Sequence, residues 1–298
     1  MRLAFLSRSR SLYTTRRLLQ AARGEGHEAV VLDPLDLFME IGAGAPALFH
    51  GGSARRLAPI DVAFPRIGAA VTEYGLAVIQ QLEIMQIPVV NRTRAIALAR
   101  DKMRCLQVLA HEGIPVPRTA MIRHPRQVAQ ALAQVGGPPV VLKLIQGSQG
   151  IGVILLESVD AVESVLDTLW SLGQVILIQE FVSESRGRDL RALVLGGRVL
   201  VAMRRQARAG EFRANIHRGG TGTIVDLPEE TRDVAARAAR IVGLEVAGVD
   251  LLEGAAGPRV MEVNSSPGFQ GLEAATGLDV AGEIVRHGLA VAAASDTA

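Results

Sequence analysis

Two short stretches near the end of the chain decide the fold: Ala247-Gly248-Val249-Asp250 and Met261-Glu262-Val263-Asn264. Both are mainly apolar, and a turn rich in Gly, Ala and Pro separates them, which predicts two neighbouring strands that run in opposite directions. Side chains alternate along a strand. We therefore expect Glu262 and Asn264 to share one face, with Met261 and Val263 on the opposite, core side.

The polar residues of these two strands form a candidate metal site. Asp250, Glu262 and Asn264 offer two carboxylates and an amide oxygen, the hard oxygen ligands that Mg²⁺ or Mn²⁺ prefers. A bridging Glu262 would hold two ions between the terminal phosphates of a nucleotide. The competing interpretation is an edge strand with solvated acids. The apolar remainder of the strand, which runs directly into Ser265-Ser266-Pro267-Gly268, argues against it.

A lysine and a glycine-rich loop follow each other in the middle of the chain. Lys143 lies on an apolar stretch, and residues 146–152 read Gln-Gly-Ser-Gln-Gly-Ile-Gly. Glycines let backbone N–H groups approach phosphate oxygens, and a buried lysine needs an anionic partner. The loop lacks the Gly-Lys-Ser/Thr of a P-loop, and a strand follows it where a dinucleotide fingerprint needs a helix. We interpret it as a flap over a triphosphate; an ordinary mobile hairpin is the alternative.

The segment Gln179-Glu180-Phe181-Val182 ends another apolar stretch. Its backbone groups are placed to hydrogen-bond an adenine edge, with Phe181 against the ring. Asp189, a few residues later, is placed to bind a ribose hydroxyl. A strand end and a simple turn would produce the same local pattern.

A basic segment precedes Gly219-Gly220 and lacks helical or strand periodicity from Phe212 onward. Such a segment is usually a solvated face, but irregular Arg, Asn and Gly are also typical of a loop that binds phosphate and carboxylate groups. No Ser-His-Asp or Cys-His arrangement and no zinc-ligand spacing is evident. The candidate residues of this segment are Arg204, Arg205, Arg208, Arg213, Asn215 and Arg218.

The rest of the chain divides into three regions. The first alternates strands with helices, which predicts an open parallel α/β sheet, and the later regions read as α+β lobes. We expect domains over residues 1–95, 96–180 and 181–298. In the N-terminal part of the chain, strands are expected over 2–6, 28–32, 61–64 and 88–91, and helices over 13–23, 71–85 and 93–111.

Composition excludes several other classes of protein. The chain has 298 residues, 49% of them hydrophobic and 21% charged, and a formal net charge of only +2, so a nucleic-acid or membrane-surface protein is not expected. Aromatic residues make up 3%, too few for a base-stacking surface. The single cysteine, Cys105, cannot form an intrachain disulfide. No signal peptide or membrane span is evident, and we expect a cytoplasmic protein.

Taken together, these motifs resemble the ATP-grasp superfamily, and within it the RimK family of ribosomal protein glutamate ligases. The resemblance covers nearly the whole chain. Segments that carry it beyond the metal and lysine motifs are Pro65-Arg66-Ile67-Gly68, Ala99-Arg100-Asp101-Lys102, Phe212 to Gly220, Ala247 to Asp250 and Met261 to Gly268.

The resemblance implies an N-terminal α/β domain followed by two lobes that clasp ATP. It also implies a reaction in which a carboxylate attacks the γ-phosphate of ATP and an amine displaces phosphate from the acyl phosphate. The product is glutamate joined to the C-terminal tail of the sixth small-subunit ribosomal protein, with poly-α-glutamate as a side activity. The family further implies a homotetramer.

Roles for individual residues also follow from the resemblance. It implies phosphate contacts from Lys102 and Lys143, adenine contacts from Glu180 and Phe181, and a ribose contact from Asp189. Arg213, Ala214 and Asn215 would lie by the triphosphate, and Asp250, Glu262 and Asn264 would bind the metal. We add the hypothesis that Arg204 or Arg218 stabilises the acyl phosphate.

Two other functions remain open at this point. One is a sister ATP-grasp ligase that joins glutamate or a similar amino acid to a small molecule or a carrier protein. The other is a non-catalytic ATP-binding regulator that docks on the ribosome. The Ser-Pro-Gly after Asn264 favours the ribosomal-protein branch, and the complete set of metal ligands argues against a regulator.

Overall fold

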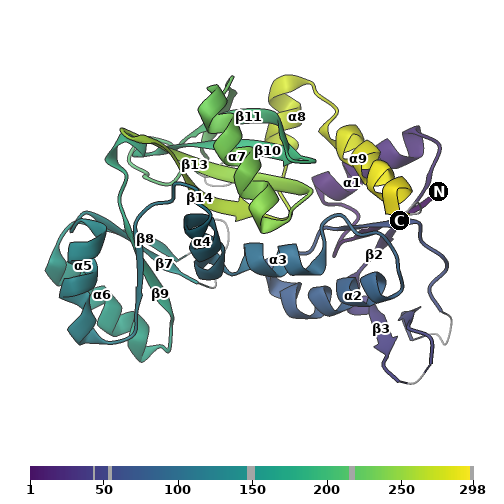
Figure 1. Ribbon diagram of the computed structural model, residues 1–298, viewed down its shortest axis with the longest axis horizontal. Helices are drawn as coiled ribbons and strands as arrows, with labels where there is room; N and C mark the ends of the chain where they lie inside the picture. The colour runs from purple at the N-terminus through teal and green to yellow at the C-terminus, as the bar shows by residue number, and fades with distance from the viewer. Residues whose placement is uncertain (43, 53–55, 146–151, 215–218, 296–298) are drawn as a thin grey trace.

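The computed structural model describes residues 1–42, 44–52, 56–145, 152–214 and 219–295. The molecule is elongated, with the two termini near one end and a helix-flanked sheet at the other (Figure 1). Three main sheets follow one another along its length. No helix in the described part of the chain is long and apolar enough to cross a membrane.

The N-terminal sheet is parallel, as the alternating pattern predicted. Its order is β2-β1-β5, formed by Glu28–Leu32, Arg2–Leu6 and Val62–Pro65. One face of β1 packs under α1 (Tyr13–Gly24) and α9 (Val280–Ser295), and the other packs against α2 (Thr72–Ile84). Burial of both faces explains why β1 is continuously apolar from Leu3 to Leu6. Helix α9 therefore returns the C-terminal end of the chain to this sheet, beside α1 (Figure 1).

Two expectations for this region were wrong. Residues 88–91 form no strand and contribute only an isolated bridge between Val89 and Ala63. The single helix expected over 93–111 is two helices, α3 (Thr93–Arg100) and α4 (Lys102–His111). The break occurs at Asp101, which is extended and whose side chain accepts a hydrogen bond from the Arg104 N–H at 3.0 Å, capping α4. The hairpin of β3 (Leu37–Glu40) and β4 (Ala47–His50) was not predicted.

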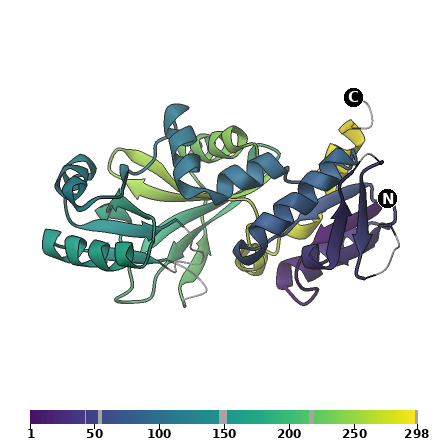
Figure 2. The same cartoon turned by 90° about the horizontal axis from the view of Figure 1, so that it is seen from below.

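The central sheet is antiparallel, in the order β6-β9-β7-β8. Its apolar face is covered by α5 (Val128–Val135) and α6 (Val159–Ser171). Seen from below, α2, α3 and α4 lead from the N-terminal sheet toward the two other sheets (Figure 2). The strands are Thr119–Ile122, Ile176–Glu180, Val140–Leu144 and Val153–Leu156, in sheet order.

The C-terminal sheet is also antiparallel, in the order β12-β11-β10-β13-β14. Helix α7 (Glu229–Val242) covers one face, and α8 (Gln270–Thr276) lies near the other. The predicted turn at Gly196-Gly197 joins β10 to β11, with positive φ at both glycines. The strands are Thr221–Ile224, Arg198–Gln206, Arg188–Leu195, Val246–Gly254 and Gly257–Asn264, in sheet order. Single 3₁₀ turns occupy Pro34–Asp36, Ala69–Val71, Pro125–Gln127 and Ser183–Ser185.

Strand β14 departs from simple alternation. Its register with β13 is irregular between Asp250 and Leu251, so Val260 and Val263 both reach the core under α7. We expected Met261 beside Val263 in the core. It is only half-buried, and among the described residues the core under α7 contains Val260 and Val263 without it. The bulge nevertheless keeps Glu262 directly opposite Asp250.

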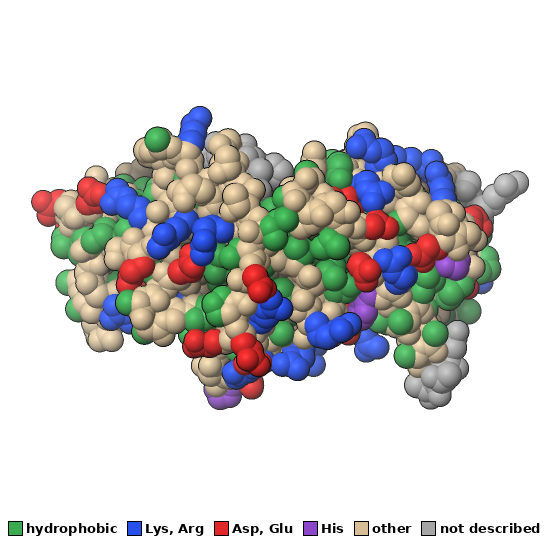
Figure 3. Space-filling view, turned by 90° about the horizontal axis from the view of Figure 1, so that it is seen from above, with side chains coloured by type: hydrophobic (Ala, Val, Ile, Leu, Met, Phe, Trp, Pro, Cys, Tyr) green, Lys and Arg blue, Asp and Glu red, His purple; other side chains and the backbone are tan. Residues whose placement is uncertain are grey.

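Basic and acidic side chains are interspersed on the face seen from above (Figure 3). This face carries no extended field of a single sign, in agreement with the small net charge.

Candidate active site

The three predicted metal ligands lie on adjacent strands of the C-terminal sheet. Asp250 pairs with Glu262, and Gly248 pairs with Asn264. Asn264 donates its amide hydrogen to the Gly248 carbonyl at 3.3 Å, which leaves its Oδ1 as the atom able to bind a cation. Gly248 has no side chain to obstruct this edge, since a Cβ there would lie 2.9 Å from Pro267.

Asp250 belongs to a row of charged residues that crosses four strands. Cross-strand pairing places Arg205 opposite Asp189, Arg191 opposite Asp250, and Asp250 opposite Glu262. All five side chains are on the sheet face opposite α7, because the intervening residues pack into the α7 core. We call Arg205, Asp189, Arg191, Asp250 and Glu262 the charged row.

Two arginines hold Asp250 within this row. Arg191 donates from Nε and Nη2 at 2.6 Å each, and Arg205 approaches the same carboxylate at 3.0 Å while also donating to Asp189 at 2.6 and 2.7 Å. Asp250 is 2% exposed and Arg205 3%. Burial acts to raise the pKa of Asp250, but the two guanidiniums outweigh it and the pKa is below its usual range. Burial prevails at Asp189, whose pKa is raised although Arg205 opposes the change.

The residues fit a divalent cation that binds together with nucleotide phosphates. Asp250 Oδ1 accepts one hydrogen bond and keeps a lone pair, and Glu262 and Asn264 Oδ1 add two oxygens. Two arginines nearby disfavour a bare cation, so phosphate charge must accompany it. Within the described ranges, no group of three or more His, Cys, Asp or Glu forms a metal cage. A site completed by phosphate oxygens and water does not require one.

Lys143 faces this site from the central sheet. It lies on β7, and its charge is felt by Glu262, Asp250 and Lys102, the first residue of α4. Burial lowers the pKa of Lys143 to about 8; Glu262 and Asp250 oppose the change and Lys102 adds to it. The structure therefore brings both predicted phosphate lysines close to the charged row.

The depressed pKa of Lys143 predicts a pH dependence for ATP binding. Phosphate binds the protonated amine, so ATP affinity should fall as pH rises through about 8. Between about pH 7 and pH 9 the loss should be roughly tenfold, the change in the protonated fraction of a group with that pKa. Lys143→Arg should remove the slope, since arginine stays charged throughout. Equilibrium binding of ATP at several pH values measures this, and a flat wild-type profile would contradict it.

Glu180 joins the central sheet to the C-terminal sheet. Its carboxylate accepts hydrogen bonds from the Arg118 N–H and Nε, both at 2.8 Å, and forms an ion pair with Arg259 on β14. Burial acts to raise the pKa of Glu180, but these donors hold it below the usual range. The Glu180 N–H is bonded to the Arg118 carbonyl at 2.9 Å. These bonds occupy the carboxylate and the N–H of Glu180. The centre of the neighbouring Phe181 ring lies 5.8 Å from the Arg186 guanidinium carbon.

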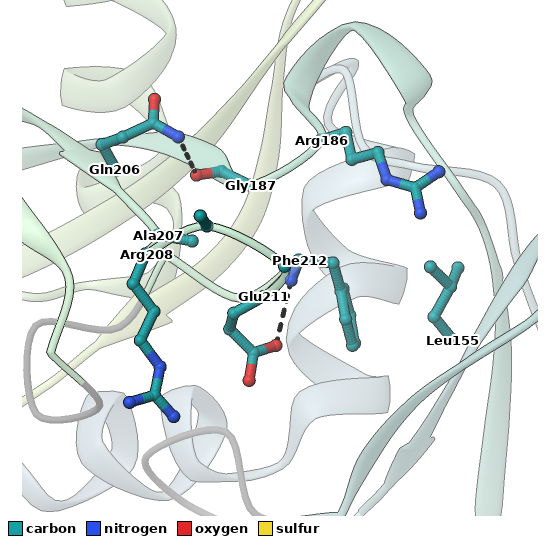
Figure 4. Close-up of a pocket in the computed structure, with 10 residues that line it drawn as sticks. Leu155, Arg186, Gly187, Gln206, Ala207, Arg208, Glu211 and Phe212 are labelled. Atoms are coloured by element: carbon teal, nitrogen blue, oxygen red, sulfur yellow. Dashed lines mark hydrogen bonds between the residues drawn. The ribbon is translucent and has the colours of Figure 1, made fainter.

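A cavity of about 370 Å³ lies between β8 and the loop that follows β11 (Figure 4). Gln206 and Glu211 line it, with Gln206 donating to the Gly187 carbonyl at 2.9 Å. Glu211 receives two hydrogen bonds from the Arg213 guanidinium, which help to lower the pKa of Glu211 to about 2. Arg213 is thus oriented by Glu211, and Ala214 is buried next to it.

The structure does not bring Arg204 to the charged row. Strand alternation places Arg204 on the α7 face, where it pairs with Glu253 at 2.8 Å. Asn215, Arg218 and residues 146–151 of the glycine-rich loop lie outside the described residues. Sequence reasoning missed Arg191, although an arginine two residues after Asp189 on an otherwise apolar strand was an available signal.

Comparisons with known proteins agree on one family. Residues 1–96 match the model of the RimK PreATP-grasp domain, and residues 99–287 match that of the RimK-like ATP-grasp domain. A probable alpha-L-glutamate ligase of Syntrophotalea carbinolica is 50% identical over 286 residues, covering 96% of this chain and 94% of that protein. One from Thioalkalivibrio sulfidiphilus is 48% identical over 285 residues, with the same coverage.

Solved structures share the fold. A RimK domain protein ATP-grasp from Sphaerobacter thermophilus superposes with a TM-score of 0.73 at 28% identity, covering 97% of this chain and all of that one. The ATP-grasp ligase PsnB, solved with a minimal precursor, Mg and ADP, has a TM-score of 0.75 at 24% identity, with 98% of each chain covered. The predicted ATP-grasp architecture is therefore confirmed.

Proposed function

Because this chain belongs to the RimK-like ATP-grasp family and is an ATP-dependent ligase, we propose that it is an α-L-glutamate ligase. In this proposal it joins the amine of L-glutamate to the C-terminal carboxylate of a polypeptide. The charged row opposite Lys143, on a chain about half identical to probable alpha-L-glutamate ligases, is the observation that supports it. We further propose the sixth small-subunit ribosomal protein as acceptor and poly-α-glutamate as a second product.

The residues of the chain divide the reaction between them. Lys143 and Lys102 would bind phosphate oxygens, Asp189 the ribose, and Arg213 the triphosphate. Asp250, Glu262 and Asn264 would hold Mg²⁺ or Mn²⁺, which when bound neutralises charge on the β- and γ-phosphates. The acceptor carboxylate attacks the γ-phosphorus and ADP leaves. The glutamate amine then attacks the acyl carbon, losing a proton, and phosphate departs with the acceptor oxygen.

The position of Arg204 changes which arginine we assign to the acyl phosphate. We propose Arg218 for this role. Arg218→Ala should lower kcat by about 10²–10³-fold, the usual cost of removing one group that stabilises developing charge, and change ATP affinity much less. Arg204→Ala is the matched control and should stay within a few-fold of wild type. Steady-state kinetics of both variants measure this, and a large kcat loss in Arg204→Ala alone would reverse the assignment.

Release of ADP tests the proposed function. Continuous release of ADP should require ATP, Mg²⁺ and glutamate, with a polypeptide or a second glutamate as the acceptor. Mass spectrometry of ribosomal proteins should show additions of whole glutamate residues. Additions to a small molecule or carrier protein instead would favour the sister ligase. ATP binding without ADP release for any acceptor would favour the non-catalytic regulator.

A further inference from the structure

Resting on the proposed function, we propose that Arg66 and Arg100 bind the side-chain carboxylate of the incoming glutamate. We call these two residues the arginine pair. Arg66 follows β5 directly, and Arg100 is the last residue of α3. They lie where the N-terminal sheet meets the end of β14.

Backbone carbonyls fix the orientation of both guanidiniums. Arg66 donates from Nη2 to the Pro267 carbonyl at 2.6 Å, and Arg100 donates from Nη2 to the Ile67 carbonyl. The Arg66 guanidinium carbon also lies 5.9 Å from the centre of the Phe269 ring. One Nη of each guanidinium is thereby occupied, while the other Nη donors have no bonded partner within the described chain.

The arginine pair has no anionic partner of its own. In the described ranges both guanidiniums donate to backbone carbonyls, and neither forms an ion pair with a carboxylate. Burial, and after it the charge of Arg100, lowers the pKa of Arg66 to about 10. Two like charges held together and partly desolvated are unfavourable unless an anion joins them. An anionic ligand would supply the missing charge.

Unsatisfied polar atoms gather at the same place. Within the described residues, the buried side-chain atoms without a hydrogen-bond partner include Nε of both arginines and Oγ of Ser265 and Ser266. The two serines directly precede Pro267, on whose carbonyl Arg66 is anchored. Buried polar atoms normally find partners, so these four atoms are available to a polar ligand.

The arginine pair lies within reach of the reacting groups. Pro267 packs over Gly248 beside Asn264, and the charge of Glu262 acts on Arg100, opposing the lowering of its pKa by burial. A carboxylate bound here would therefore place the rest of its molecule next to the metal ligands. The proposed function places the nucleotide between the central and C-terminal sheets. The amino acid would then bind on the side of the N-terminal sheet.

The chemistry favours a carboxylate of glutamate over another phosphate. A planar guanidinium matches a carboxylate bidentately, and a ligase for glutamate must distinguish its side-chain carboxylate from the amide of glutamine. Two positive charges achieve this, because glutamine would leave both without an anion.

The test uses Arg66→Gln and Arg100→Gln, with Arg100→Lys as the charge-keeping variant. Losing one charge-assisted contact, about 1.5–3 kcal/mol, should raise the KM for glutamate roughly 10- to 150-fold and leave the KM for ATP within about threefold. The preference for glutamate over glutamine in kcat/KM should fall by the same factor. Arg100→Lys should recover part of it, and Arg94→Gln, an exposed arginine on the same helix, should change neither constant.

Other outcomes overturn the inference. An unchanged KM for glutamate in both Gln variants would refute it, and so would a rise confined to the acceptor KM or to the ATP KM, which would assign the pair to those ligands. Thermal melting of each variant separates loss of binding from loss of folding. If the wild-type enzyme ligates glutamate and the Gln variants have the same KM for glutamate, only the inference about the arginine pair fails. If the wild-type enzyme never uses glutamate, the proposed function fails as well.

Discussion

Replacing Glu262 by glutamine should reduce kcat by about 10²–10³-fold or more. The substitution preserves the size of the side chain and one acceptor oxygen but removes the charge that faces Asp250 across β13 and β14 and Lys143 from β7. In the proposed site a cation would then lose one of its two carboxylate ligands, and the γ-phosphate would lose the ion that neutralises it. Single-turnover measurement of ADP formation at saturating ATP and Mg²⁺ isolates the chemical step.

Glu253→Gln is the matched control for this experiment. Glu253 lies on β13 as well, but its partner is Arg204 on the α7 face, away from the charged row. Its replacement should leave kcat within about twofold, as expected for a partly exposed ion pair. Normal turnover in Glu262→Gln would remove Glu262 from the metal site.

Replacing Arg205 by methionine should destabilise the C-terminal sheet by about 3–5 kcal/mol. Arg205 is 3% exposed and bonds both Asp189 and Asp250, which are also buried. Methionine fills the space but leaves two buried carboxylates with a single guanidinium, that of Arg191. Urea denaturation followed by circular dichroism measures the change in the free energy of unfolding.

The neighbouring residue again supplies the comparison. Arg204→Met removes an ion pair whose side chains are 41% and 32% exposed, so the loss should be only about 0–1 kcal/mol. Equal destabilisation by the two substitutions would show that burial of the Arg205 network contributes nothing.

Local patterns predicted much of this architecture. The parallel N-terminal sheet, the hairpin at Gly196-Gly197 and the antiparallel β13–β14 pair all followed from apolar runs and turn residues. These features depend on neighbours in the sequence, where periodicity carries the information. The pairing of Asp250 with Glu262 is of this kind.

The errors arose where one residue interrupts a regular pattern. Asp101 suits helical periodicity by its surroundings, yet its side chain caps the next helix and divides the expected one. The bulge between Asp250 and Leu251 displaces Met261 from the core position that strict alternation assigns to it. Such interruptions depend on cross-strand partners and on capping geometry. The periodicity of apolar residues along the sequence carries no information about either.

The candidate site was incomplete for a different reason. The roles assigned to three arginines depend on contacts with residues far away in the sequence. Arg191 contacts Asp250, Arg66 contacts Pro267, and Arg100 contacts Ile67. The basic run in the sequence does not reveal which of its arginines faces which side of the sheet. Only the paired strands separate Arg204 from Arg205.

Transfer of a labelled oxygen atom tests the central claim, ligation through an acyl phosphate, most directly. An acceptor peptide with heavy oxygen in its C-terminal carboxylate would be incubated with enzyme, ATP, Mg²⁺ and glutamate. The account predicts that each new peptide bond yields one phosphate carrying one heavy oxygen, because that oxygen attacks the γ-phosphorus and leaves with it. Product formed with unlabelled phosphate would contradict the account.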